Sequence, residues 1–271
     1  MSYPTLRRGS RDAAHVELLQ HALNEAGQSF KADGSFGPRT EEAVRAFQTM
    51  NGLPVTGVAG PETWKALSRI SRYARPVDTT ETLPGFRGDL DWIHRFEGHR
   101  GTAYWPGGAS GVTLDPGLDL GHAAPDLIRK VITPLLSDEQ LAALNRVLGI
   151  RGEAARDALR GQPLLSTIRI DLQTARELFP HIAKPFWRGT TTRFPNLASA
   201  SAPPQAHTAM LSLSYNRGYQ NPHLNVLAKP IESADWRRLG ELIGSMQQDH
   251  KLPGIRDRRR AEGDLILSAL G

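Results

Sequence analysis

A break in the hydrophobic pattern at residues 71–86 divides this chain of 271 residues into two regions of regular periodicity. The break contains two prolines, a glycine and many polar residues, and no apolar spacing persists through it. Such a composition is typical of a linker between folded segments. We therefore expect one domain over residues 1–70, a linker over 71–86 and a second domain over 87–271.

The first region has the pattern of three short helices separated by glycine turns. Apolar side chains recur at helical spacing in three places, and glycine turns at residues 33–37 and 57–61 lie between them. Each turn is followed by a threonine near the start of the next helix. The pattern predicts a compact three-helix unit. Its apolar positions are Val16, Leu19, Leu23, Ala43, Val44, Phe47, Trp64 and Leu67.

These residues resemble the peptidoglycan-binding type 1 module over about residues 6–68. The resemblance implies a three-helix fold and binding to bacterial peptidoglycan. It assigns no ligand contact to any residue, because most matching positions are glycines for turns or apolar residues for a small core. The matching positions include Leu19-Gln20, Asp33-Gly34-x-Phe36-Gly37, Thr40, Phe47-Gln48, Gly52-Leu53, Gly57 and Gly60-Pro61-x-Thr63-Trp64.

The second region is predicted to be mainly helical, and its first helix carries a candidate catalytic acid. Asp89 predicts an N-cap, and Ile93, Phe96 and Glu97 then fall on one face of a helix that ends at Gly98. A carboxyl group among apolar neighbours at a helix end suits a general acid. From the helix alone, a solvated surface glutamate is the alternative.

A short β section is predicted to follow that helix. Tyr104-Trp105 and residues 112–114 have strand character, and the glycine-rich segment 106–111 predicts the turn of a hairpin. Thr113 and Asp119 lie six residues apart across a Pro-Gly bend, which could direct both side chains into one site. Taken singly, Thr113 reads as an ordinary strand residue and Asp119 as a helix cap. Only the spacing of Thr113 and Asp119 taken together favours a functional site.

Glu97, Thr113 and Asp119 form the set needed for acid-catalysed cleavage of a glycosidic bond. One carboxyl group must protonate the leaving oxygen, and a second carboxylate must stabilise positive charge or help a water to attack. The set resembles the pesticin-like branch of the phage-type lysozyme superfamily, in which a glutamate precedes Ser-Gly-x-Thr-x-x-x-Gly-x-Asp-Leu-Gly. Residues 211–218 and 254–262 resemble later helices of that family.

The resemblance implies an α+β lysozyme-like domain with Glu97 as general acid, and with Thr113 and Asp119 positioning a water. One departure is Asp115, where glycine is commoner, and this extra carboxylate raises the question of which aspartate acts. We prefer Asp119. The resemblance also favours inversion at the anomeric carbon, which needs carboxyl groups about 6.5–9.5 Å apart.

The predicted substrate-binding residues are Tyr104, Trp105, Ser110 and Asn216. The two aromatic rings could stack on sugars or pack in the hairpin, and Asn216 could bind an N-acetyl group or cap a helix. No cofactor or metal is predicted, because the histidines around Glu97 do not have the His-Glu-x-x-His zinc spacing. The arginines of 256–260 predict a solvated basic helix face, with contact to an anionic wall or membrane as the alternative.

Other segments predict helices without chemistry. Ser137 begins a capping-box pattern, and the stripe at Leu239, Leu242 and Ile243 indicates another helix. A further helix is expected to begin after Asp171 and to end at Pro180.

Composition limits the function without choosing it. The chain has no cysteine, which excludes disulfides, thiol catalysis and cysteine-bound zinc. Its net charge of +5 favours an anionic polymer or surface as partner. No apolar signal core is visible in residues 1–8. We expect synthesis in the bacterial cytoplasm, action on the wall in the periplasm and dependence on a holin-type membrane-permeabilising protein.

The sequence thus predicts a modular endolysin that hydrolyses the β-1,4 bond between N-acetylmuramic acid and N-acetylglucosamine. The expected partner is peptidoglycan and not nucleic acid, and a monomer is favoured. Two alternatives stay open. One is a lytic transglycosylase, which gives anhydro-muramic ends and needs no second carboxylate. The other is a wall-binding protein without enzymatic activity. A zinc amidase or peptidase is disfavoured by the histidine spacing.

Overall fold

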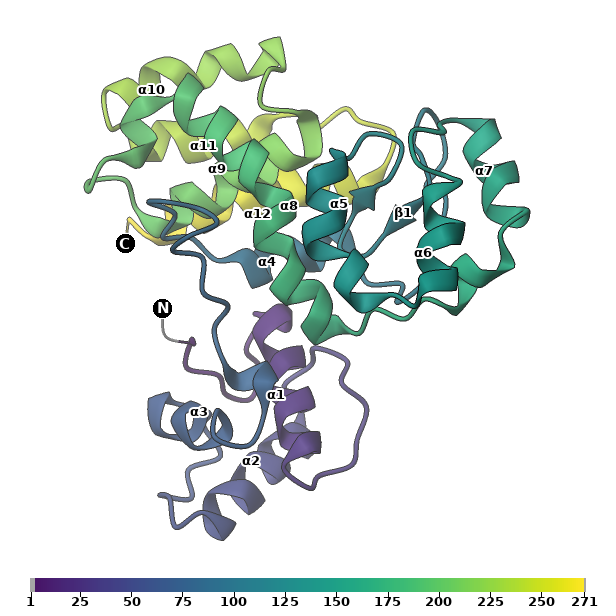
Figure 1. The fold of residues 1–271 in the computed structure, drawn as a ribbon. Helices are drawn as coiled ribbons and strands as arrows, with labels where there is room; N and C mark the ends of the chain where they lie inside the picture. The colour runs from purple at the N-terminus through teal and green to yellow at the C-terminus, as the bar shows by residue number, and fades with distance from the viewer. Residues whose placement is uncertain (1–2, 271) are drawn as a thin grey trace. The chain divides into compact units, whose positions relative to one another are not determined.

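The computed structural model describes residues 3–270 and is mainly α-helical, as the sequence predicted (Figure 1). These residues contain twelve α-helices and one sheet of two strands. The chain separates into two compact units, residues 1–78 and 79–271. None of the described helices is long and apolar enough to cross a membrane.

The first unit contains the three predicted helices. They are α1 (Ala13–Glu25), α2 (Pro38–Met50) and α3 (Pro61–Leu67). A Gly-Pro pair begins both α2 and α3, because proline at the first helical position needs no hydrogen-bond acceptor for a backbone N–H and has its φ preset. All eight apolar positions predicted from the spacing are buried in the core of this unit.

An amide side chain organises each of the two turns between these helices. Gln20 Oε1 accepts hydrogen bonds from two successive backbone N–H groups beginning at Asp33, both at 2.9 Å. Gln48 Oε1 makes the same contacts beginning at Thr56, at 2.9 and 3.0 Å. The first unit is therefore an internal repeat in which a buried glutamine replaces the missing backbone partners of each loop.

The segment expected as a linker is largely packed. Residues Arg72–Ala74 form a 3₁₀ turn, and Ala74 is buried in the first core. Leu83 and Phe86 are buried in the second unit, and Trp187 Nε1 donates a hydrogen bond to the Pro84 carbonyl at 3.0 Å. Apolar residues inside the polar stretch explain this difference, since each contacts the domain on its own side.

The second unit has two hydrophobic clusters, and α8 (Leu172–Arg193) contributes to both. The larger cluster, called here the helical lobe, contains the C-terminal half of α8 and the helices near the C-terminus. Tyr215 packs against both clusters. The other helices of this lobe are α4 (Leu90–Glu97), α9 (Pro204–Arg217), α10 (Ala228–Glu232), α11 (Trp236–Ser245) and α12 (Pro253–Ser268).

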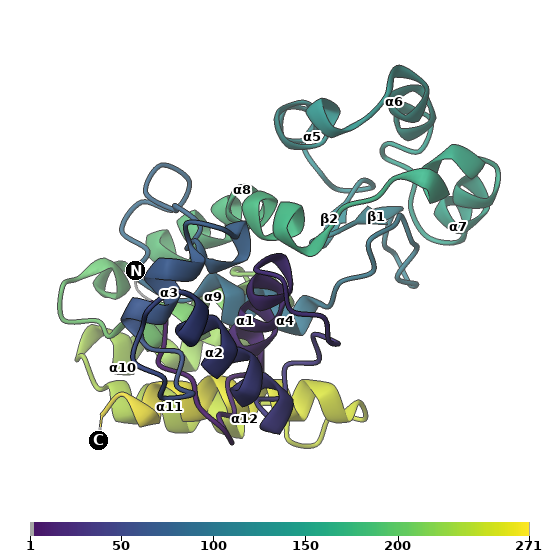
Figure 2. The same ribbon diagram turned by 90° about the horizontal axis from the view of Figure 1, so that it is seen from below.

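The smaller cluster, called here the β lobe, surrounds the two-stranded sheet. β1 (Thr113–Leu114) pairs with β2 (Leu118–Asp119) in antiparallel register. Figure 2 shows short helices gathered near this sheet at one end of α8. They are α5 (Pro125–Val131), α6 (Asp138–Asn145) and α7 (Glu153–Arg160). The capping box predicted at Ser137 is confirmed at the start of α6.

Two predictions of secondary structure are wrong in detail. The expected hairpin between 104–105 and 112–114 is reduced to one bridge between Tyr104 and Thr113, and the regular partner of β1 is β2. Pro180 lies inside α8 and does not end it. The helix continues because residues on both sides of the proline are buried in the two lobes, and this packing offsets the lost hydrogen bond.

Candidate functional site

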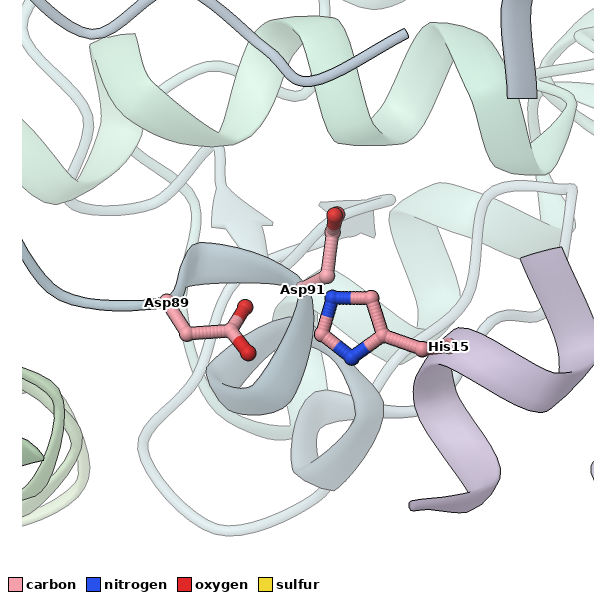
Figure 3. Close-up of side chains that lie close together, drawn as sticks. All are labelled: His15, Asp89 and Asp91. Carbon is pink, nitrogen blue, oxygen red and sulfur yellow. The ribbon is translucent and has the colours of Figure 1, made fainter. Parts of the chain in front are cut away.

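Glu97 is the last residue of α4, as predicted. Figure 3 shows Asp89 at the start of α4. Its side chain accepts a hydrogen bond from Trp92 N at 3.0 Å and caps the first turn of the helix. Gly98 ends the helix with φ of +72°, a conformation that favours glycine. The Glu97 side chain is 19% exposed, so it is accessible but mostly enclosed.

A buried ion pair fixes α4 against α8. Arg176 donates from Nε and Nη2 to the two carboxylate oxygens of Asp91, at 2.7 and 2.9 Å, and its side chain is 1% exposed. Two parallel hydrogen bonds hold both the distance and the orientation of the helix. Phe96, expected beside the catalytic acid in an apolar setting, is 36% exposed and packs its ring against Trp92.

The charged neighbour of Glu97 comes from α12. Arg258 Nη2 lies 2.8 Å from Glu97 Oε1, and the arginine side chain is 6% exposed. The Arg258 guanidinium also lies 5.3 Å from the centre of the Phe96 ring. The site around Glu97 is therefore more cationic than the apolar setting predicted from its own helix.

Two of the arginines of α12, Arg258 and Arg259, do not lie on the solvated face that the sequence predicted, whereas Arg260 is exposed. Arg259 is fully buried, and Glu262 lies between it and Arg258 at 3.0 and 3.3 Å. Ser212 of α9 donates to Glu262 Oε1 at 2.5 Å and accepts from Arg258 Nη2 at 2.9 Å. We call Ser212, Arg258, Arg259 and Glu262 the buried charge network; it connects α9 and α12 to Glu97.

The pKa values within this network follow from burial. Desolvation raises the pKa of Glu262, with the two arginines opposing that rise. Desolvation lowers the pKa of Arg259 to about 10, so this group stays protonated at neutral pH. Sequence reasoning missed the network, although the spacing of Arg258 and Glu262 at i and i+4 was a signal for a pair on one helix face.

The register of the sheet places Thr113 directly opposite Asp119. Residues that are paired across an antiparallel ladder have side chains on the same face, so the two predicted water-positioning residues are neighbours. Asp119 Oδ1 accepts hydrogen bonds from Gly111 N at 2.9 Å and Gly121 N at 2.8 Å. The Thr113 hydroxyl donates to the Gly111 carbonyl at 3.3 Å, and Thr113 is 3% exposed.

The glycines around these two residues allow a close approach of backbones. A Cβ atom on Gly111 would lie 2.3 Å from Gly121 N and 2.6 Å from Asp119 Oδ1. Only glycine at position 111 therefore permits its backbone N–H to reach the carboxylate. Gly117 has φ of +93°, and a Cβ there would lie 2.9 Å from the Tyr215 hydroxyl. Gly111 and Gly117 therefore allow close approaches that a side chain at either position would block.

Asp115, the second aspartate considered from the sequence, is an anchor for the chain after α4. It is 2% exposed, and its Oδ2 accepts hydrogen bonds from the backbone N–H groups of Arg100, at 2.7 Å, and Gly101. His99 Nδ1 lies 3.3 Å from the same oxygen. These contacts to one carboxylate oxygen tie the segment after Glu97 to the end of β1.

Two tyrosines lie in the electric field of the candidate catalytic residues. Burial raises the pKa of the Tyr104 phenol, and the charges of Asp115, Glu97 and Asp119 raise it further. Burial and the charge of Glu97 likewise raise the pKa of Tyr215. The Tyr104 phenol thus interacts electrostatically with both candidate carboxylates, Glu97 at the end of α4 and Asp119 in β2. The guanidinium carbon of Arg100 lies 4.2 Å from the centre of the Tyr104 ring.

The other predicted substrate-binding residues have structural contacts. Trp105 Nε1 donates to the Ser110 carbonyl at 3.1 Å, and the Trp105 ring packs against the β lobe. These contacts shape the glycine-rich turn. Asn216 is exposed at the end of α9, and its Oδ1 accepts a hydrogen bond from Arg259 at 3.3 Å.

We expect the buried His94 on α4 to lower the free energy of unfolding of the protein in acid. Burial lowers its pKa from 6.5 to about 4, and its Nε2 has no hydrogen-bond partner among the described residues. Between about pH 6.5 and 4 the unfolded chain therefore binds a proton that the folded chain does not, so stability falls as pH falls through this window. The loss approaches about 3 kcal/mol near pH 4.

Urea unfolding at pH 7 and pH 5 checks this expectation. The His94→Gln variant removes the titrating ring and should lose less of its unfolding free energy between the two pH values than the wild type loses. An equal loss in both proteins would contradict the role given to His94.

Comparison with known proteins gives a family match within the first unit. Residues 12–67 match the sequence family described as "Putative peptidoglycan binding domain". A Bacillus licheniformis protein described as "Probable N-acetylmuramoyl-L-alanine amidase" is 40% identical over 82 residues, which is 29% of this chain and 23% of the relative. The amidase CwlL of the same organism is 39% identical over 69 residues, which is 24% of this chain and 19% of the relative.

These alignments cover less than a quarter of each curated relative and are too short to span the second unit. A solved structure titled as that of the Burkholderia AP3 phage endolysin covers 99% of this chain and 100% of its own, at 23% identity and a TM-score of 0.24. A similarity at this level establishes neither a shared fold nor a shared activity.

Proposed function

We propose that this protein is a modular peptidoglycan hydrolase whose second unit cleaves the β-1,4 bond between N-acetylmuramic acid and N-acetylglucosamine. The first unit would bind the wall, in keeping with its family match over residues 12–67. The observation that carries the proposal is the pairing of Thr113 with Asp119 on one face of the sheet. The charges of Asp119 and Glu97 both raise the pKa of the Tyr104 phenol, which relates the pair to Glu97. An acid and a water site are the parts that the reaction needs.

In the proposed reaction, Glu97 donates its proton to the glycosidic oxygen while the bond from that oxygen to the muramic C1 breaks. A water held by the Thr113 hydroxyl and Asp119 attacks C1, and Asp119 takes the proton that this water loses. Asp119 Oδ1 already accepts two backbone hydrogen bonds, so Oδ2 is the oxygen assigned to the water. Arg258, at 2.8 Å, stabilises the carboxylate that Glu97 becomes.

This mechanism predicts inversion at the anomeric carbon. A water that attacks from the face opposite the leaving group forms the α-anomer of the new reducing end. Proton NMR of a digest of a soluble glycan chain, recorded within the first minutes, should show the α-anomer signal before mutarotation. First appearance of the β-anomer, or trapping of a glycosyl-enzyme adduct, would contradict the assignment of Asp119 to a water.

Two other reactions are separated from this one by their products. A lytic transglycosylase gives anhydro-muramic ends, and an amidase of the kind named for the two Bacillus relatives frees amino groups of the stem peptide. Digestion of purified walls should release reducing ends without a matching rise in free amino groups.

Peptidoglycan is the proposed partner and substrate, and the bacterial cell wall is the proposed place of action. Dependence on a holin-type protein is a further proposal that follows from the endolysin interpretation. A purified protein should then lyse chloroform-treated Gram-negative cells but leave intact cells unlysed.

A further inference from the structure

The first unit contains a cavity of about 430 Å³ between the first turn and the start of α2. A volume of this size accommodates a small ligand or a few residues of a peptide. Its lining includes an aromatic side chain, two cations and one carboxylate, namely Phe30, Lys31, Arg39 and Asp33. The charges of opposite sign distinguish it from an ordinary apolar groove.

The walls of this cavity are held in place by side chains that lie behind them. Asn24 fixes Phe30, because its Nδ2 donates to the Phe30 carbonyl at 2.8 Å and its Oδ1 accepts from Phe30 N at 3.1 Å. Gln20 Nε2 donates to Asp33 Oδ1 at 3.1 Å. The Ser35 backbone N–H bonds the same oxygen at 2.9 Å, and these contacts lower the pKa of Asp33 and keep it ionised.

The two cations of the cavity are available to a ligand. In the described part of the first unit, neither Lys31 nor Arg39 takes part in an ion pair or a side-chain hydrogen bond, and both are exposed. By contrast, Gln20 uses both ends of its amide within the protein. The ligand contacts therefore fall to Lys31, Arg39 and the free oxygen of Asp33.

The internal repeat shows that this charge set belongs to one turn only. Gln20 and Asp33 are separated by 13 residues, whereas Gln48 and Thr56 at the equivalent places are separated by 8. The extra length carries Phe30 and Lys31. The second turn also has Thr56 in place of Asp33 and a glutamate in place of Arg39. The fold of the module does not require these residues, because the second turn folds without them.

We propose that this cavity binds the stem peptide of peptidoglycan at a residue that carries both a free carboxylate and a free amino group. Lys31 and Arg39 bind the carboxylate, Asp33 binds the ammonium group, and the aliphatic chain between them lies against Phe30. The inference rests on the proposed wall-binding role of the first unit and names the part of the wall that this unit contacts.

Binding to purified walls tests the inference with the full-length chain carrying Glu97→Gln, which prevents digestion. Sedimentation with insoluble walls gives the apparent dissociation constant for three proteins: this parent, the parent with Arg39→Glu and the parent with Lys65→Glu. Lys65 is an exposed cation on α3, so both variants change the net charge of the first unit equally. Circular dichroism confirms that each variant is folded.

We expect Arg39→Glu to weaken wall binding about tenfold or more, as loss of a charge-assisted contact implies, and Lys65→Glu to have little effect. Soluble stem peptide should compete with the walls, and glycan strands stripped of peptide should not. Equal weakening by both variants, or competition by bare glycan, would overturn the assignment of the cavity while leaving the module a wall binder. If the parent protein does not sediment with walls, both the wall-binding role and the inference fail.

Discussion

Glu97→Gln is expected to lower the rate of wall lysis by about 10²–10⁴-fold, because glutamine has no acidic proton to give to the glycosidic oxygen. The substitution keeps the size of the side chain, and the amide oxygen can face Arg258, whose Nη2 lies 2.8 Å from Oε1 of Glu97 in the wild type. The fold should therefore be retained. The loss of turbidity of a suspension of purified walls, followed at a fixed enzyme concentration, measures the effect.

A matched control separates the loss of the acid from a general effect of removing a carboxylate. Glu241 is exposed on α11 and is 3.2 Å from Arg238, so Glu241→Gln removes the same charge from a solvated ion pair. This variant should lyse walls at the wild-type rate. Retention of more than about a tenth of the activity by Glu97→Gln would show that Glu97 is not the general acid.

Glu262→Ala is expected to lower the free energy of unfolding of the second unit by about 3–5 kcal/mol, the usual effect of breaking a buried ion pair. Glu262 is fully buried and is 3.0 Å from Arg259 and 3.3 Å from Arg258. Without it, two buried guanidinium groups lose their common counter-ion. The hydroxyl of Ser212 also loses its acceptor.

Urea unfolding followed by tryptophan fluorescence measures this effect, because four of the five tryptophans lie in the second unit. Glu241→Ala is the control, and it should change the unfolding free energy by less than about 1 kcal/mol, as exposed pairs do. A similar small change for Glu262→Ala would contradict the view that the buried charge network holds α9 and α12 together.

The elements that depend on local signals could be predicted from the sequence. The Gly-Pro pairs before α2 and α3, the Asp89 cap and the Ser137 capping box are each determined by residues within one helical turn. The apolar spacing of the first unit also identified its core, because a three-helix unit buries one face of each helix.

Features that depend on distant residues were missed or misjudged. Pro180 reads as a helix end when it is considered alone, and only the packing of α8 in both lobes explains why the helix continues. Arg258 and Arg259 read as a solvated pair until Glu262 and Ser212 are placed beside them. The local sequence reports which helix a residue occupies, but the partner helix determines whether a charge is buried.

The candidate site illustrates both cases. The spacing of Thr113 and Asp119 suggested that they act together, and the register of β1 and β2 pairs them. The same spacing could not show that Asp119 Oδ1 is occupied by Gly111 and Gly121, or that Asp115 anchors the chain after α4. Those contacts depend on backbones that approach each other only in the folded unit.

Mass spectrometry of a wall digest made in oxygen-18 water tests the central claim most directly. Hydrolysis of the muramic glycosidic bond adds the oxygen of one water to C1, so each new muramic reducing end should carry one labelled oxygen. The Glu97→Gln variant should release few such fragments. Unlabelled anhydro-muramic ends, or intact glycan strands with released stem peptides, would contradict the proposal that this protein is a muramidase.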